Sequence, residues 1–166
     1  MMDETLIQKA KMKNPDAFTE LMKSQMQSMY RTAKAILMND EDVADAIQDT
    51  LLVCWEKLSE LKADQFFKTW MTKILIHNCY GIIRSSRRIT YTDKLPERVS
   101  EEHVSNIEWR EVLSVVDAKY RIVLILFYSE GFHTKEIAKI LGITDSAVRT
   151  RLSRGREQLR EQYNAQ

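Results

Sequence analysis

The sequence predicts an all-α protein of two small helical domains joined by an extended linker. Four glycines and two prolines in 166 residues are few for a chain rich in tight β-turns. Apolar residues recur at intervals of three and four over long stretches, which is the period of one helix face. Asparagine or threonine precedes several of these stretches, where its side chain can cap the free N–H groups of a first helical turn.

Two long helices are predicted in the first third of the chain. Asn14 can cap a helix that begins at Pro15 and continues to about Met38, because proline is tolerated at the first helical position. Asn39 can cap a second helix, whose acidic first turn complements the positive end of the helix dipole. The second helix carries one apolar stripe, which consists of Val43, Ile47, Leu51, Cys54, Leu58 and Leu61. Its acidic side chains are therefore expected to point outward.

A third helix is predicted from about Phe67 to Arg88, with Trp70, Ile74 and Tyr80 facing inward. Residues 1–90 are therefore expected to form the first domain. Residues 91–106 contain a proline and several Ser and Thr without a sustained apolar period, which indicates an extended linker.

Residues 107–166 are expected to form a second domain of about four helices. Thr134 can cap one of them, and Gly142 can end it in the left-handed conformation. Thr144 can cap the last helix. Ala138 and Gly142 leave room for two helices to cross closely, as in a DNA-binding helix-turn-helix.

The last predicted helix separates apolar from basic side chains. On a helical wheel its narrow apolar seam consists of Val148, Leu152, Gly155 and Leu159. The basic and hydroxylated face consists of Ser146, Arg149, Thr150, Ser153, Arg156 and Arg160, with Arg154 and Arg151 further round. Such a face suits a DNA major groove, with Arg149, Thr150 and Ser153 reading bases. Arg151, Arg154 and Arg156 are expected to grip phosphates. The alternative is a solvated helix whose arginines pair with Glu157 and Glu161.

Charge alternates in blocks along the chain, although the formal net charge is only +1. Residues 39–64 hold eight acidic side chains and two lysines, whereas residues 65–94 hold six basic side chains and one acid. Residues 95–118 are again acidic, and residues 119–166 are basic. Because local potential steers association, such blocks indicate several partner surfaces of opposite sign. Solvated helix faces are the alternative.

Several functional classes are disfavoured by the sequence. Cys54 and Cys79 lie within apolar helical patterns and are expected to be buried reduced thiols. His77, His103 and His133 have no nearby ligand set or nucleophile, so we expect no catalytic residue, metal or cofactor. No apolar run is long enough to span a bilayer, and the N-terminal MMDETLIQKAKMK lacks the apolar core of a signal peptide. A cytoplasmic protein is expected.

The N-terminal and C-terminal halves of the sequence each resemble bacterial RNA polymerase sigma factors. The promoter-binding C-terminal domain of that family is similar to YRIVLILFYSEGFHTKEIAKILGITDSAVRTRLSRGREQLR. The family's core-docking segment resembles EDVADAIQDTLLVCWEKL, and its −10 helix, F-x-x-W-[LM]-x-x-I-x-x-N, resembles FKTWMTKILIHNCYGIIRSSRR. A short linker with no intervening domain indicates the extracytoplasmic-function group. The resemblance covers about residues 15–163 and implies an alternative sigma factor that directs promoter-specific initiation without catalysis.

The resemblance also implies which residues contact the −10 element. It places Asn78 where the family helps to capture a flipped base, with residues 61–69 completing the pocket. Lys73, Arg84, Arg87 and Arg88 would hold backbone phosphates. His77 stands where the family often has Arg, and Ile82 where it commonly has Asp.

The resemblance also implies protein partners. Asp45, Gln48 and Asp49 lie at i, i+3 and i+4 and would meet a coiled coil on the β′ subunit of core RNA polymerase. The apolar first helices of the second domain would rest on the β flap, and the linker would either thread toward the polymerase active centre or act as a passive tether. Members of the group are usually held inactive by an anti-sigma factor, often membrane-anchored. The free protein is expected to be a monomer with no small-molecule substrate.

Two other functions remain alternatives at this point. A stand-alone helix-turn-helix regulator would bind a two-fold operator tightly without polymerase. A helical enzyme would need a convergent catalytic constellation, and the sequence offers none.

Overall fold

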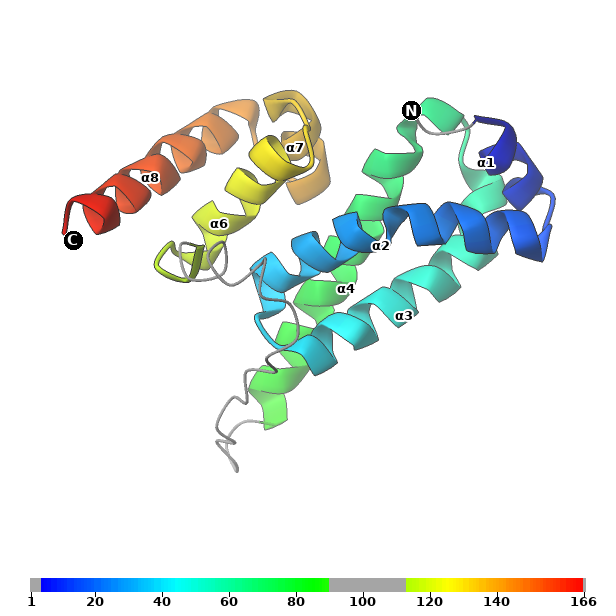
Figure 1. Ribbon diagram of the computed structural model, residues 1–166, viewed down its shortest axis with the longest axis horizontal. Coiled ribbons are helices and arrows are strands. Elements are labelled where there is room, and N and C mark those ends of the chain that lie inside the picture. The colour runs from blue at the N-terminus through cyan, green and yellow to red at the C-terminus, as the bar shows by residue number, and fades with distance from the viewer. Residues whose placement is uncertain (1–3, 90–112, 166) are drawn as a thin grey trace.

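The computed structural model describes residues 4–89 and 113–165, and the side chains of residues 87–89 are excluded from that description. The predicted linker, residues 91–106, and most of the first helix predicted after it lie outside the described residues. Every regular element in the described ranges is helical (Figure 1). None of the described helices is both long and apolar enough to cross a membrane.

The N-terminal part, residues 4–89, is a bundle of long helices. Its elements are α1 (Glu4–Lys11), α2 (Pro15–Leu37), α3 (Asp40–Lys57), the 3₁₀ turns η1 (Leu58–Glu60) and η2 (Asp64–Phe66), and α4 (Phe67–Ile89). α3 lies against both α2 and α4, and α1 packs across α2. α2 and α4 match their predicted spans and α3 begins where predicted, whereas α1 was not anticipated.

Side-chain caps fix where two of these helices begin. Asn14 Oδ1 accepts a hydrogen bond from the backbone N–H of Ala17 at 3.1 Å. Asn39 Oδ1 accepts from the N–H groups of Glu41 at 2.8 Å and Asp42 at 3.3 Å. Both caps were predicted, and both satisfy donors that have no partner within the helix.

The predicted apolar stripe is confirmed on α3 for Val43, Ile47 and Cys54, which are buried, whereas Leu51 is half-buried. Leu58 and Leu61 are buried as well, but α3 ends at Lys57, so they lie in η1 and directly after it. Trp70 and Ile74 of α4 pack against the core as predicted. Tyr80 keeps 37% of its surface exposed, so the prediction that it faces inward was wrong.

The C-terminal part, residues 113–165, contains shorter helices. Its regular elements are α6 (Ala118–Leu124), the π-helix η4 (Ile125–Ser129), α7 (Thr134–Leu141) and α8 (Asp145–Asn164). Thr134 does not cap α7. It is the first helical residue, and His133 occupies the cap position without a side-chain hydrogen bond. The predicted cap of α8 is confirmed, with Thr144 accepting from the N–H of Ala147 at 3.1 Å.

Glycine serves two different purposes in this part. Gly142 ends α7 with φ of 68°, as predicted, but a Cβ there would meet nothing within 4 Å, so it is not needed for a close helix crossing. The close approach occurs at Gly155 of α8. A Cβ on Gly155 would lie 3.0 Å from Leu124 Cδ1 and 3.3 Å from Tyr120 Cβ.

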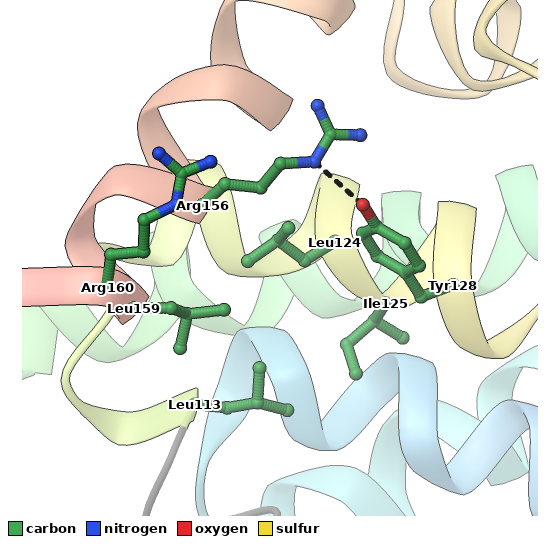
Figure 2. A pocket seen from close by; sticks show the side chains of 7 residues that line it. All are labelled: Leu113, Leu124, Ile125, Tyr128, Arg156, Leu159 and Arg160. Carbon is green, nitrogen blue, oxygen red and sulfur yellow. Dashed lines mark hydrogen bonds between the residues drawn. The ribbon is translucent and has the colours of Figure 1, made fainter. Parts of the chain in front are cut away.

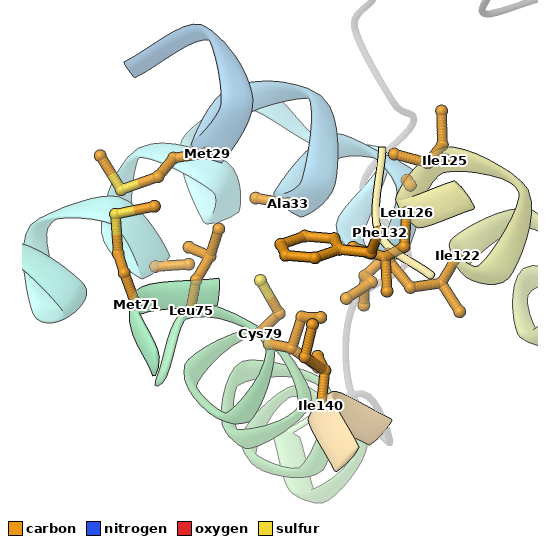
Figure 3. Packing of buried hydrophobic residues seen from close by; sticks show 14 of the residues in the cluster. Met29, Ala33, Met71, Leu75, Cys79, Ile122, Ile125, Leu126, Phe132 and Ile140 are labelled. Carbon is orange, nitrogen blue, oxygen red and sulfur yellow. The ribbon is translucent and has the colours of Figure 1, made fainter. Parts of the chain in front are cut away.

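The two parts pack directly against each other. α6 contacts α2, and α7 contacts α4. Figure 3 shows Phe132 pointing toward Ala33 and Cys79, with Ile140 beside Cys79. All four side chains belong to one continuous buried cluster. The sequence predicted two domains but not this shared core.

Candidate nucleic-acid interface

The outward face of α8 carries the predicted base-reading side chains. Ser146, Arg149, Thr150, Ser153 and Arg154 are all exposed. Val148 and Leu152 are buried on the opposite side with Gly155, which confirms the apolar seam. Arg149 is 66% exposed, and its Nε lies 3.2 Å from Asp145 Oδ2 one turn earlier. That pair orients the guanidinium along the helix.

Arg156 does not extend this face. Its Nε donates a hydrogen bond to the Tyr128 hydroxyl at 2.7 Å, and its guanidinium lies 5.6 Å from the centre of that ring. Figure 2 shows both residues at the rim of a groove of about 280 Å³ between α6, η4 and α8. The groove is lined by Leu113, Leu124, Ile125, Tyr128, Arg156, Leu159 and Arg160. A helical wheel places Arg156 near Arg149, but it shows one helix only and cannot reveal the contact with Tyr128, which lies 28 positions earlier.

Arg151 is half-buried and lies close enough to Tyr80 of α4 for its charge to act on the phenol. Burial raises the pKa of Tyr80, and the positive charge of Arg151 opposes that rise. Arg154, in contrast, is exposed and free to meet an external anion.

The second group of predicted side chains lies on α4. Lys73 and Arg84 are exposed there, whereas the side chains of Arg87 and Arg88 lie outside the described residues. A polar cleft of about 560 Å³ opens between α4 and α3. It is lined by Asp42, Asp49, His77, Asn78, Gly81, Ile82, Ser85 and Ser86.

Asn78 is held against α3. Its Nδ2 donates to Thr50 Oγ1 at 3.0 Å, and the Thr50 hydroxyl donates to the carbonyl of Ala46 at 2.7 Å. His77, the preceding residue, is exposed in the same cleft. Counting the family's −10 motif from Phe67 brings its asparagine to position 77, which is His in this chain, one residue before Asn78. The cleft therefore presents both residues as candidates for base contact.

The segment 61–69 does not meet Asn78 in this structure. Its residues precede and begin α4, and Asn78 lies nine residues beyond Thr69, about 14 Å along the helix. Lys11 fixes the segment from α1, with Nζ 2.5 Å from Asp64 Oδ1. Phe66 projects from it and is 56% exposed. The cleft that contains Asn78 is lined by residues of α3 and α4 and by none of residues 61–69.

The acidic patch predicted on α3 is fully presented to solvent. Asp45, Gln48 and Asp49 are exposed on one side of the helix. Leu52, one turn further, is 63% exposed and adds an apolar neighbour that was not predicted as part of this patch. Its position outside the predicted apolar stripe was the feature of the sequence that could have indicated this exposure. Burial raises the pKa of nearby Asp42, and the charges of Asp45 and Glu41 raise it further.

The described residues offer little for metal or thiol chemistry. No group of three or more His, Cys, Asp or Glu in residues 4–89 and 113–165 could hold a metal ion. Cys54 and Cys79 are free and buried, as predicted, and burial raises the pKa of each thiol to about 12. Neither is therefore a reactive thiolate in this state.

Comparisons with known proteins cover both parts of the chain. The family model for sigma-70 region 2 matches residues 21–89, and that for sigma-70 region 4 matches residues 107–159. RNA polymerase sigma factor SigV of Bacillus subtilis is 26% identical over 140 residues, which cover 82% of this chain and 84% of SigV. ECF RNA polymerase sigma factor SigW of the same organism is 27% identical over 182 residues, covering 98% of this chain and 97% of SigW.

Two solved structures share the fold. One is CnrH in complex with the cytosolic domain of CnrY, with a TM-score of 0.75, 24% identity and 99% coverage of each chain. The other is RpoE from Bartonella quintana in complex with the anti-sigma factor NepR. Its TM-score is 0.74 at 23% identity, and the alignment covers 87% of this chain and 94% of RpoE.

Proposed function

The chain belongs to the extracytoplasmic-function group of the sigma-70 family and is a non-catalytic sigma factor that directs transcription initiation, and we propose how its surfaces divide that work. The observation that carries the proposal is the exposed face of α8, where Arg149 stands beside Thr150 and Ser153. These three side chains read the −35 element in the major groove. Ser146, Arg151 and Arg154 contact its phosphates. Arg151 turns away from Tyr80 to do so.

The cleft between α3 and α4 acts at the −10 element. Lys73 and Arg84, extended along the chain by Arg87 and Arg88, attract the DNA backbone. Asn78 or His77 contacts a base that has left the stack, because an unstacked base needs replacement hydrogen bonds. The hydrogen bond that Asn78 donates to Thr50 Oγ1 pre-orients its side chain for this role.

Two protein surfaces attach the factor to core RNA polymerase. Asp45, Gln48 and Asp49, with Leu52 beside them, meet the β′ coiled coil, where the acids pair with basic side chains and the leucine enters an apolar depression. The groove that Leu124, Ile125 and Leu159 line receives an apolar segment of the β flap. Arg156 at its rim acts on the polymerase and not on the −35 DNA, which revises the role expected from the sequence.

Regulation follows the pattern of the group. CnrH was solved with CnrY, and RpoE with the anti-sigma factor NepR. We expect an anti-sigma factor, membrane-anchored as is frequent in the group, to hold this chain in the cytoplasm, where the polymerase is. Between residues 91 and 106 the chain links the two DNA contacts, so that their binding energies combine.

The test is transcription with purified core enzyme on a genomic promoter library, with sequencing of transcript 5′ ends. Specific starts with shared −35 and −10 sequences are expected only when the chain is added. A chain that starts no transcripts, and instead binds a two-fold operator tightly without polymerase, would be a stand-alone regulator.

A second experiment separates the two candidates for base contact. Asn78→Ala and His77→Ala are compared for closed-complex binding and for promoter opening, followed by permanganate reactivity of unpaired thymines. The variant of the base-contacting residue should lose opening by about tenfold while keeping closed-complex affinity, because one hydrogen bond to a base is lost. Equal loss of binding and opening in both variants would remove the base-contact role from this cleft.

A further inference from the structure

Glu130 joins the C-terminal part to the N-terminal part. Its side chain is only 1% exposed. Oε2 accepts a hydrogen bond from the Ser28 hydroxyl at 2.5 Å, and Oε1 accepts from Arg31 Nε at 2.9 Å. Lys68 Nζ lies 3.4 Å from Oε2 and donates to the Glu130 carbonyl at 3.1 Å. We call Glu130 with Ser28, Arg31 and Lys68 the Glu130 latch.

The partners of this carboxylate all come from the other part of the molecule. Ser28 and Arg31 lie on α2 and Lys68 on α4, whereas Glu130 follows the π-helix η4. Its position is fixed by the hydrogen bond from its N–H to the Ile125 carbonyl at 3.0 Å. A buried carboxylate is stable only with its partners in place. Glu130 therefore favours the packed arrangement of the two parts.

Arg121 forms a second polar bridge. Its residue is 7% exposed, and its Nε donates to the carbonyl of Ala35 at 2.5 Å. Ala35 lies in the last turn of α2, where carbonyl groups lack helical partners and attract a cation. Burial lowers the pKa of Arg121, so the bond to α2 offsets part of its desolvation.

The packed arrangement does not fit a promoter. α7 contacts α4, and Arg151 of α8 lies close to Tyr80 of α4. Elements centred at −35 and −10 are about 25 base pairs apart, which is about 85 Å of duplex at 3.4 Å per pair. The 23-residue α4 is itself only about 34 Å long. The two DNA-reading helices must separate to reach both elements.

We propose that the structure is a self-inhibited closed state, and that the Glu130 latch holds the helix-turn-helix, through α7, against α4 until core polymerase separates the two parts. The inhibitory consequence rests on the proposed function, whereas the latch itself does not. Closing reduces the fraction of chains that can bind both elements. A chain that is open one time in ten binds about tenfold more weakly than one that is always open.

The latch can be tested on the free, full-length protein through its two cysteines. Cys79 of α4 lies beside Ile140 of α7, whereas Cys54 lies on α3, which packs on α2 and α4. Two variants break the latch: Glu130→Ala, and the double variant Arg31→Ala with Lys68→Ala, which changes only partly exposed cations. Lys11→Ala, which breaks an ion pair within the N-terminal part, is the matched control.

The measurement is the iodoacetamide alkylation rate of each cysteine, resolved by peptide mass spectrometry. Both latch variants should accelerate the alkylation of Cys79 by about tenfold or more. Opening exposes this thiol, and an exposed thiol has a pKa of about 8.5 and a larger thiolate fraction. Cys54 should stay slow in every variant, and Lys11→Ala should change neither rate. Unchanged Cys79 in both latch variants overturns the proposal. Parallel acceleration of both cysteines also overturns it, because it reports loss of the fold.

Inhibition is tested separately with core polymerase. In the latch variants, the concentration of the chain that gives half-maximal transcription should fall several-fold. An unchanged concentration in variants with accelerated Cys79 overturns inhibition. Failure of transcription with every variant and the original chain refutes the proposed function, and leaves the alkylation result on the latch standing.

Discussion

The N-terminal part, residues 4–89, and the C-terminal part, residues 113–165, bury their apolar side chains in different ways. α2, α3 and α4 have 23, 18 and 23 residues and enclose Leu21, Met71 and Phe67 among themselves. α6 and α7 have only 7 and 8 residues, and Phe132 and Ile140 pack toward α2 and α4. The C-terminal part therefore completes its core with the neighbouring part.

The two DNA-contacting surfaces are therefore stabilised to different degrees by the helices beneath them. The cleft at Asn78 is built on helices that stabilise one another. The α8 face rests on α6 and α7, which gain much of their burial from the closed arrangement. Opening should thus cost the C-terminal part more stability than the N-terminal part, because more of its apolar surface returns to water.

The largest effect is expected from Phe132→Ala. Phe132 is 5% exposed, and its loss should cost about 3–5 kcal/mol. The cost should fall on the C-terminal part, so that hydrogen exchange accelerates in α6 and α7 while α2 and α3 stay protected. Leu21→Ala, from a fully buried position in the N-terminal part, is the control and should accelerate exchange in α2 and α3. Uniform acceleration by both variants would show that the parts unfold together.

The two helical glycines provide a matched comparison. Gly155→Val should destabilise the C-terminal part by about 1–3 kcal/mol, because even a Cβ would lie 3.0 Å from Leu124 Cδ1. At Gly81 a Cβ would meet only Arg84 Nη2 at 3.8 Å, so Gly81→Ala should stabilise α4 by about 0.5–1 kcal/mol. Urea denaturation followed by circular dichroism measures both. A stabilising Gly155→Val would contradict the tight packing of α8 on α6.

Arg149 and Arg156 should separate by function. Arg149→Ala should alter −35 base preference by about 1–3 kcal/mol at one position, because its guanidinium is 66% exposed beside its partner Asp145 and can meet a base edge. Arg156→Ala should leave base preference unchanged and weaken polymerase binding, since its guanidinium lies against Tyr128. Selection from a randomised −35 library measures the first effect, and holoenzyme formation the second. Identical profiles would remove the distinction between face and groove.

The smallest effects are expected at the caps. Asn39→Ala and Thr144→Ala should each cost about 1 kcal/mol, because each removes a side-chain acceptor from a first helical turn. Thr144→Ser should retain most of the stability. Thermal unfolding monitored by circular dichroism gives the three values. If Thr144→Ala were as stable as the original chain, the hydrogen bond that Thr144 accepts from Ala147 would contribute nothing to the stability of α8.

Much of the local structure could be predicted from the sequence. The bounds of α2 and α4, the start of α3 and the cap at Thr144 follow from side chains within about four positions of one another. The prediction failed at Thr134, because two adjacent polar residues, His133 and Thr134, compete for the start of α7. It also failed at Tyr80, because a helical period does not tell how far the neighbouring helices reach.

The sequence predicted which residues belong to the candidate site better than it predicted how their side chains are oriented. The exposed side chains of α8 and the acidic patch of α3 follow from helical spacing. The bond between Asn78 and Thr50 joins residues 28 positions apart, as does that between Arg156 and Tyr128. No local sequence pattern predicts a contact between residues so far apart, so the orientations of Asn78 and Arg156 are seen only in the folded structure.

Spacing along single chain segments was enough to predict α2 and α4, the caps at Asn14, Asn39 and Thr144, the apolar seam of α8 and the family. The tertiary structure alone decided that the two parts share a core and that Glu130 joins them. The Glu130 carboxylate meets Ser28 and Arg31 across 102 and 99 positions. Burial pairs charges by proximity in space, and in this molecule proximity in space arises from packing between distant helices.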